Sequence, residues 1–288
     1  MNFERFRVPP GTAVKLADFA THQTEPFRDK SAAEEKLAGD VQKLADLQSK
    51  LYAQNTYALL IILQGIDAAG KDGTIKHVMS GVNPAGCQVT GFKVPSEEEL
   101  DHDYLWRYMR ALPRRGNIGI FNRSHYEEVL VVRVHPELLG REHIHASKKR
   151  EDLWAKRYRE INDFERYLEE NGIEVLKFFL HLSKEEQKDR FLARLDSADK
   201  NWKFSEADVK ERDYWDDYQN AFEEMLSNTS TKDAPWYVVP ADRKWFTRVA
   251  VSDIIVAKLE SMNLSYPKLD GSQKDALDRA RKILESEK

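Results

Sequence analysis

The stretch that most constrains the fold is "LLIILQGIDAAGKDGTIKHV", residues 59–78. It has the pattern of a buried strand, a glycine-rich turn and the start of a helix. Gly65 to Lys71 fit G-x-x-x-x-G-K, and the flanking strand and helix supply the context that this motif requires. Such a loop binds phosphate because its small residues let backbone N–H groups turn inward at a helix N-terminus. The stretch therefore predicts an α/β protein with a phosphate-binding loop.

The predicted phosphate contacts come from this loop and from the first turn of its helix. Lys71 supplies a full positive charge, and the backbone around it supplies N–H donors. The other members of the predicted set are Gly65, Ala68, Ala69, Gly70, Asp72, Gly73 and Thr74.

Two carboxylates in this region need an explanation, because a site for anions should repel negative charge. In the usual loop, a hydroxyl after the lysine holds Mg²⁺ against the phosphates. Here that position is Asp72, so we expect Asp67, inside the loop, to bind Mg²⁺ instead. This hard cation prefers carboxylate and phosphate oxygens. Asp72 itself favours the helix dipole and can cap backbone N–H groups.

Apolar patterns along the rest of the chain predict strands that alternate with helices. We expect strands at 57–63, 87–94, 117–121, 174–182 and 234–240, and helices at 33–52, 70–80, 97–112, 151–170 and 245–262. This alternation is typical of βαβ units, which build a parallel sheet with right-handed crossovers. Two further helices, with capping signals at Ser183 and Ser205, form an excursion off the sheet. The residues from 267 onward predict a surface helix.

The charge and cysteine content restrict the partners. The formal net charge is −4 with a pI of about 6.1, so no global basic field indicates nucleic acid. Cys87 is the only cysteine in the sequence, which excludes a disulfide framework and a multi-cysteine metal site. No stretch approaches the roughly 18 apolar residues that span a bilayer. We expect a cytoplasmic protein that binds neither nucleic acid nor membrane.

Longer motifs resemble the polyphosphate kinase 2 family. They are "GIDAAGKDGTIK", "GVNPAGCQVTGFKVPSEEELDHDYLWRYMRALPRRGNIGIFNRSHYEEVLVVRV", "WKFSEADVKERDYWDDYQNAF" and "APWYVVPADRKW". The resemblance runs from about residue 35 to residue 262. It implies a three-layer α/β/α P-loop kinase core with a parallel sheet and a helical lid. It also implies transfer of the terminal phosphoryl group of inorganic polyphosphate to a nucleotide, with Mg²⁺ or alternatively Mn²⁺, in a homo-oligomer (a dimer or a tetramer).

The resemblance also suggests a division of the chain. The expected parts are an N-terminal extension with an amphipathic helix (1–54), the first part of the core (55–182), the helical lid (183–230), the last strand and helix of the core (231–266) and a charged C-terminal tail (267–288).

The family motifs assign roles to individual residues. Asp67 and Lys71 match the Walker A metal ligand and the phosphate-binding lysine. In "FNRSHYEE" many members have Asp at the position of Asn122 and Asn at the position of Glu127, and this sequence has the reverse pair. The resemblance is to the subgroup that accepts both AMP and ADP and forms ATP. Glu127 is then the second predicted metal ligand, and Arg123 matches a family arginine.

Polyphosphate is a flexible polyanion, so its site should be a channel of Lys and Arg side chains. A lid over such a site should deliver an arginine to the transferring group; the matching residue is Arg194, with Arg190 one turn earlier. Most other lid cations are expected to form a solvated face: Lys184, Lys188, Lys200, Lys203, Lys210 and Arg212. Nearer the loop the candidates are Lys76, Lys93 and Arg133, with Arg114 and Arg115 equally well explained as a solvated turn.

Two alternatives remain open from the residues alone. An ATP-dependent nucleoside monophosphate kinase needs the same loop, Mg²⁺ and lid arginines. A non-catalytic nucleotide-sensing module would bind through the loop without turnover. The acceptor is expected to be an adenine nucleotide, with guanine as an alternative. The sequence gives neither the net direction of transfer nor the preferred polyphosphate length.

Overall fold

The computed structural model describes residues 3–141, 152–198, 201 and 205–287. Its centre is a five-stranded sheet in the order β2-β3-β1-β4-β5, in which every pair of neighbours is parallel. The strands are β1 (Ala58–Gln64), β2 (Cys87–Gly91), β3 (Ile118–Asn122), β4 (Ile173–His181) and β5 (Trp236–Pro240). β1 is buried along its whole length, as its apolar sequence predicts. The expected α/β class with a parallel sheet is confirmed.

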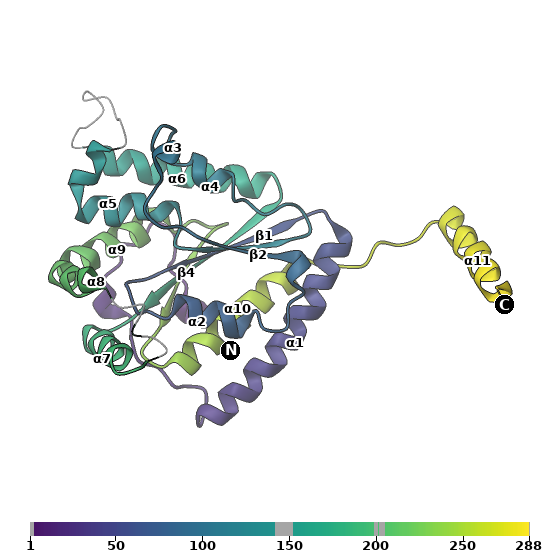
Figure 1. Cartoon of the computed structure of the whole chain (residues 1–288), viewed down its shortest axis with the longest axis horizontal. Coiled ribbons are helices and arrows are strands. Elements are labelled where there is room, and N and C mark those ends of the chain that lie inside the picture. Colours follow the sequence, from purple (N-terminus) through teal and green to yellow (C-terminus); the bar gives the residue numbers. More distant parts are fainter. Residues whose placement is uncertain (1–2, 142–151, 199–200, 202–204, 288) are drawn as a thin grey trace.

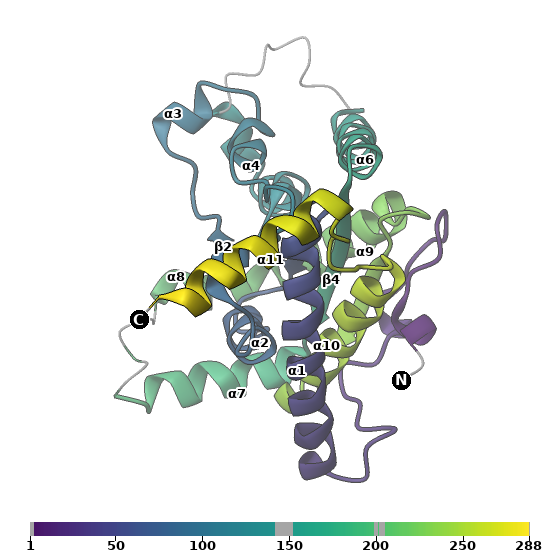
Figure 2. The ribbon, with the colours of Figure 1, turned by 90° about the vertical axis from the view of Figure 1, so that its right-hand side faces the viewer.

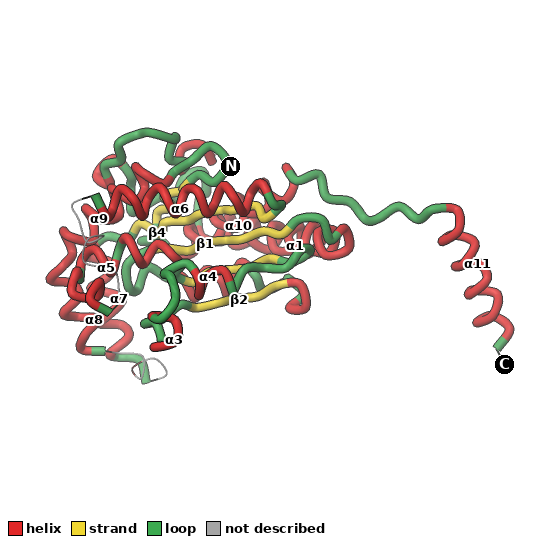
Figure 3. Tube along the Cα trace, turned by 90° about the horizontal axis from the view of Figure 1, so that it is seen from above, coloured by secondary structure: helices red, strands yellow, loops and turns green. Residues whose placement is uncertain are grey.

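Helices cover both faces of the sheet (Figures 1 and 3). One face carries α1 (Lys30–Gln54), α2 (Lys71–Val78) and α10 (Lys244–Ser261), and α1 and α10 lie side by side in Figure 2. The other face carries α6 (Leu153–Glu170) and α9 (Trp215–Thr229). Alternate residues of β1 enter the two apolar cores, with Leu60 on the α6 side and Leu59 on the α10 side. This alternation produces the three-layer architecture.

The single helix expected at 97–112 is wrong. The chain forms two short helices instead, α3 (Glu97–Leu100) and α4 (Trp106–Met109). Asp103 lies between them, and its carboxylate accepts a hydrogen bond from the backbone N–H of Leu105 at 3.0 Å. Such a local bond offers the backbone an alternative to helix hydrogen bonding, which explains the break. Tyr104 and Leu105 still pack against the core, so the apolar pattern reports burial but not a continuous helix.

The helical excursion also differs from the expectation of two helices. It contains α7 (Lys184–Leu195), α8 (Glu206–Lys210), a 3₁₀ turn (Glu211–Tyr214) and α9. Ser183 caps α7 by accepting the N–H of Glu186 at 3.1 Å. The Glu186 carboxylate bonds to Arg190 instead of returning to the cap, so only half of the expected capping box is formed. α9 packs in the layer on the sheet, where Met225 and Leu226 are fully buried.

The two ends of the chain behave differently. Near the N-terminus, Val8 donates its N–H to the carbonyl of Trp236 at 2.9 Å, so this segment adds to the edge of β5. At the other end, α11 (Gly271–Ser286) stands away from the body, and each of residues 265–287 is exposed (Figure 1). The expected surface helix is therefore present. Among the described helices none is long and apolar enough to cross a bilayer.

Candidate active site

The phosphate loop follows β1 at the carboxyl edge of the sheet. Gly65 has a φ of 152°, and a side chain there would place its Cβ 2.9 Å from the carbonyl oxygen of Leu180. Ala68 and Gly70 have φ values of 64° and 100°. These left-handed positions wind the loop tightly before α2, which starts at Lys71. The sequence G-x-x-x-x-G-K therefore folds locally as it predicts, with glycine at the most crowded position.

Lys71 is held beneath the loop. Its Nζ donates to the carbonyl oxygens of Gly65 at 2.6 Å and Ile66 at 3.3 Å, and the residue is only 8% exposed. Burial lowers the pKa of Lys71 to about 8, and the positive charge of Arg123 acts in the same direction. A bound anion would favour the charged form, so this environment suits a phosphate-binding lysine.

Arg123 joins the loop to the motif at the end of β3. Its guanidinium forms ion pairs with Asp67 of the loop and, at 3.1 Å, with Glu127. Arg123 has a φ of 66°, which is uncommon for a residue with a side chain and turns the chain sharply after the strand. Glu127 first and Asp67 after it raise the pKa of this guanidinium. The two predicted metal ligands therefore converge on one cationic group.

A second contact joins the same two elements. The side-chain amide of Asn122 donates to the carboxylate of Asp72 at 2.6 Å. Asp72 lies in the first turn of α2, as expected, so its negative charge interacts favourably with the helix dipole as well as with this amide. The Asn122–Asp72 hydrogen bond gives the amide at position 122 a structural partner that the family motif alone does not indicate.

The carboxylates of Asp67 and Glu127 suit a metal ion that binds together with phosphate. Within the described ranges, no group of three or more His, Cys, Asp or Glu side chains is arranged to hold a metal by itself. Mg²⁺ commonly uses one or two carboxylates and completes its shell with substrate phosphates and water. Asp67 and Glu127 contact the same guanidinium beside the loop, so both face one region. This pair of carboxylates would suit that mode of Mg²⁺ binding.

A cavity of about 1030 Å³ opens from this region. Its walls come from the loop, the segment after β2, the α3–α4 region, α6 and the helical excursion. Lys93, Arg123 and Glu127 line it, as do Asp67 and, from the excursion, Gln187, Asp208, Glu211 and Tyr218. Burial raises the pKa of the Asp208 carboxyl, and the nearby charge of Asp67 adds to this. The cavity therefore combines apolar walls with charged groups, both at its loop end and along α6 and the α3–α4 region.

Side chains of α7 contact the phosphate loop or lie near it. Arg194 contacts Asp208 at 3.5 Å; Asp208 lines the cavity, and Arg194 itself does not. Gln187 donates to the carbonyl of Asp67 at 3.0 Å and accepts a bond from Arg212 at 2.6 Å. We did not predict Gln187, although its position three residues before Arg190 and seven before Arg194 places it on the same face of the helix.

Arg190 makes contacts that the sequence did not predict. Its guanidinium donates to the loop carbonyls of Ala68 at 2.8 Å and Ala69 at 3.1 Å, and to the carbonyl of Ala241 at 2.6 Å. Its Nε donates to Glu186 at 2.8 Å. Because these donors already have partners, Arg190 holds the loop against α7 and the end of β5. These contacts show a residue that positions the loop, and the phosphate contact of Arg190 stays a prediction.

The remaining predicted cations lie in several separate places. Lys93 lines the cavity, whereas Lys76 is exposed on α2 and does not line it. Arg133 also lies outside the cavity wall, where it bonds to Tyr158 at 2.9 Å and Glu224 at 2.6 Å and so pairs two helices; its phosphate contact stays a prediction. Arg115 donates to the carbonyls of Thr56 and Asn171, at the opposite edge of the sheet. Lys200 and Lys203 lie outside the described residues.

These features define a class of protein. A parallel α/β core carries a phosphate loop at its carboxyl edge, an acidic motif on the neighbouring strand and helices above both, which is the organisation of a P-loop phosphotransferase. Comparison with known proteins is more specific. A family model described as polyphosphate kinase 2 matches residues 27–267, and the chain belongs to this family.

Similar proteins cover nearly the whole chain. The sequence is 51% identical over 282 residues to an ADP-polyphosphate phosphotransferase of Rhodopseudomonas palustris, with 98% of each chain covered. It is 46% identical over 265 residues to an AMP/ADP-polyphosphate phosphotransferase of Meiothermus ruber, with 92% of this chain and 95% of that protein covered. The crystal structure of polyphosphate kinase 2 from Arthrobacter aurescens TC1 matches with a TM-score of 0.86 at 40% identity, covering 98% of this chain and 96% of that one.

Proposed function

We propose that this protein transfers the terminal phosphoryl group of inorganic polyphosphate to AMP and to ADP, forming ADP and ATP. The observation that carries the proposal is the pairing of Arg123 with both Asp67 and Glu127. This pairing brings the phosphate loop and the strand-end motif together at one end of the large cavity. Family membership and the names of the relatives support polyphosphate as the donor.

The two substrates have separate places in this proposal. The donor end of polyphosphate lies on the loop, where Lys71 and the N-terminus of α2 attract phosphate. The nucleotide occupies the cavity, whose volume of about 1030 Å³ is ample for a small-molecule ligand. The transferring group then passes between them, next to Arg123.

Phosphoryl transfer needs in-line positioning and neutralisation of charge rather than covalent participation by the protein. Lys71 and Arg123 neutralise phosphate oxygens on the two sides of the transferring group. Asp67 and Glu127 would hold Mg²⁺, which supplies further positive charge to those oxygens when it is bound. Arg194 of α7 pairs with Asp208, which lines the cavity, and its proposed role is to reach the transferring group.

The choice of acceptor is the finer part of the proposal. One relative is named for ADP and the other for AMP and ADP, at 51% and 46% identity. The Asn122 and Glu127 pair supports both acceptors, because moving the carboxylate five residues along the motif relocates the negative charge near the metal. Such a relocation can change which nucleotide phosphate is presented to the donor.

The test is incubation of the purified protein with AMP, Mg²⁺ and long-chain polyphosphate, without ATP, followed by chromatography. The proposal predicts that ADP accumulates first and that ATP follows. ADP without ATP would limit the protein to AMP, and conversion of ADP in a parallel incubation that contains ADP, with no conversion of AMP, would limit it to ADP. Transfer only when ATP is supplied as the donor would overturn the proposal in favour of an ordinary nucleotide kinase.

A further inference from the structure

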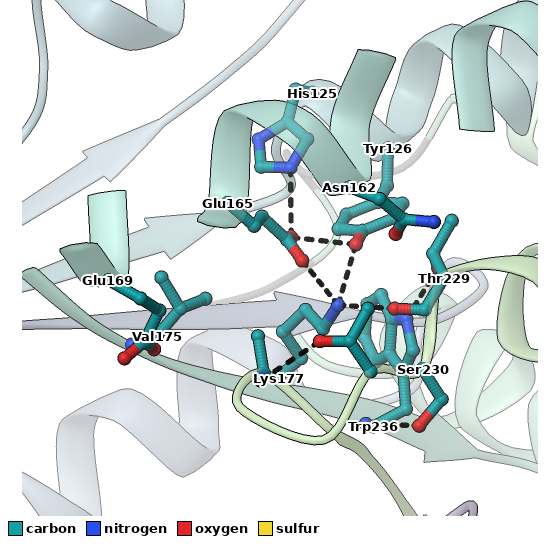
Figure 4. A network of polar contacts seen from close by, with 12 residues as sticks. His125, Tyr126, Asn162, Glu165, Glu169, Val175, Lys177, Thr229, Ser230 and Trp236 are labelled. Atoms are coloured by element: carbon teal, nitrogen blue, oxygen red, sulfur yellow. Dashed lines mark hydrogen bonds and ion pairs between the residues drawn. The ribbon is translucent and has the colours of Figure 1, made fainter. Parts of the chain in front are cut away.

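A charged network lies in the core behind the active site (Figure 4). Its centre is Lys177 of β4, which is fully buried. The ammonium group donates to the Glu165 carboxylate at 2.5 Å, the Tyr126 hydroxyl at 2.8 Å and the Thr229 carbonyl at 2.7 Å. All three N–H donors of the lysine therefore have partners. The proposed mechanism uses none of these groups, so their presence in the core calls for a separate role.

Glu165 of α6 completes the network. Its carboxylate accepts from Lys177, from the Tyr126 hydroxyl at 2.7 Å and from the His125 ring at 3.3 Å. Burial lowers the pKa of His125, so the ring is neutral and donates through Nε2. The network thereby joins α6, β4 and the end of α9 to the short 3₁₀ helix His125–Val129.

That short helix belongs to the active-site motif. Tyr126 is the residue before Glu127 and lies three positions after Arg123. The chain reaches it through the left-handed turn at Arg123 and through Ser124, whose buried hydroxyl accepts from the Gln64 amide at 3.1 Å. A turn of this kind persists only when its surroundings hold it in place. Tyr126 provides such an anchor, with its ring packed against Trp236 at 4.7 Å and its hydroxyl fixed in the network.

An apolar group of the same size would fill this space without the desolvation of two charges. The charged network adds directional hydrogen bonds, and these fix the position of the Tyr126 hydroxyl. We propose that Lys177 and Glu165 are positioning residues that hold the Arg123–Glu127 segment in the geometry required for transfer to the nucleotide. This inference rests on the proposed function for the nature of the reaction, but the network itself is independent of it.

The position of the network predicts an asymmetric effect on the substrates. Its contacts act on the strand-end motif, whereas the loop that holds Lys71 has further support from Arg190 and Gln187 in addition to its ion pair with Arg123. Loosening the network should therefore misplace Arg123 and Glu127 and leave the site for the donor phosphate in place. A role in stability alone would lower the melting temperature and leave the kinetic constants of the folded protein unchanged.

The experiment compares variants that remove the charges together. In Lys177→Met/Glu165→Gln neither charge is left unpaired in the core, which avoids the main cause of unfolding. The matched control is Lys258→Met/Glu174→Gln, which removes an ion pair of 2.5 Å that also involves β4 but lies at the start of the strand, three residues before Lys177. Tyr126→Phe removes one hydroxyl and serves as the test if the double variant does not fold. The readouts are kcat, both KM values and the ADP dissociation constant by calorimetry.

For the network variants we expect kcat to fall roughly 10-fold to 100-fold, as for a displacement of about 1 Å at a reacting group. The ADP dissociation constant should rise, the KM for polyphosphate should stay unchanged, and the control should match the wild type. Wild-type kinetics in a folded network variant, or equal losses in the control, would overturn the inference. The rate of the wild type with polyphosphate tests the proposed function separately. The ADP dissociation constant measures the effect of the network on nucleotide binding even if the donor proves to be ATP.

Discussion

At the scale of single residues, Lys71 gives the site its expected pH dependence. Burial lowers its pKa to about 8, and Arg123 contributes in the same direction. Polyphosphate binds the charged ammonium more tightly than the neutral amine, so binding raises this pKa. The affinity for polyphosphate should therefore be highest below about pH 8 and decline as Lys71 loses its proton above it. Calorimetric titration of polyphosphate from about pH 7 to about pH 9.5 measures this decline.

Lys71→Arg is the control for that titration. Arginine keeps its charge throughout this range, so the variant should bind more weakly but with an affinity that does not change with pH. A wild-type affinity that stays constant through pH 8, or a decline of equal size in the variant, would show that another group controls the titration.

The Asn122–Asp72 hydrogen bond makes a second prediction at this scale. Asn122→Asp places two carboxylates at hydrogen-bonding distance, 2.6 Å in the wild type, and should lower the free energy of unfolding by about 1 kcal/mol without Mg²⁺. Adding Asp72→Asn to the same chain exchanges the amide and the carboxylate and should restore most of that loss. Urea denaturation of the three proteins measures both effects. A double variant as unstable as the single one would contradict the pairing.

At the scale of elements, α7 and the phosphate loop act as one unit. Arg190 spans the loop carbonyls and the carbonyl after β5, and lysine cannot reproduce this planar set of donors. Arg190→Lys should lower the free energy of unfolding by about 2 kcal/mol, because buried carbonyls lose their partners. It should also raise the KM for polyphosphate. The assignment to a loop-positioning role would fail if denaturation and this KM were both unchanged.

α11 is the opposite case, since it contributes no buried residue. Deletion of residues 268–288 should leave the free energy of unfolding and the melting temperature unchanged, because no apolar surface is lost from the core. Thermal denaturation of the shortened and full chains measures this, with size-exclusion chromatography of both alongside. A lower melting temperature or a smaller assembly would mean that α11 packs against another chain.

The elements themselves show what the sequence can and cannot predict. All five strands lie within a few residues of their expected places, because apolar runs bounded by turn residues are a strong local signal. The expected helix at 97–112 is not formed as one piece, because the Asp103 carboxylate accepts a hydrogen bond from the N–H of Leu105 and interrupts it. The roles of Arg190 and Gln187 could not be predicted either, since they depend on which carbonyls the fold places opposite α7.

At the scale of the whole molecule, the parallel sheet assembles the site. β1 and β3 are neighbours, and the pairing of Leu63 with Asn122 places the end of β3 beside the loop. Arg123 then donates its N–H to the carbonyl of Leu63 at 3.1 Å, so its side chain starts next to Asp67. Ligand sites of open α/β sheets lie at this carboxyl edge. Motifs that are 56 residues apart in sequence therefore meet, as the family resemblance implied.

The central claim is that the carboxylate of Asp67 belongs in a phosphate loop because a cation stands between it and the phosphates. The most direct test is a Mg²⁺ titration of polyphosphate-driven turnover in Asp67→Asn, with Asp46→Asn on the exposed side of α1 as the matched control. We predict a loss on the order of 100-fold at saturating Mg²⁺ and a weaker dependence on the metal, with folding intact because Asp67 and Arg123 are partly exposed. A folded variant with the rate and the metal dependence of the wild type would contradict the claim.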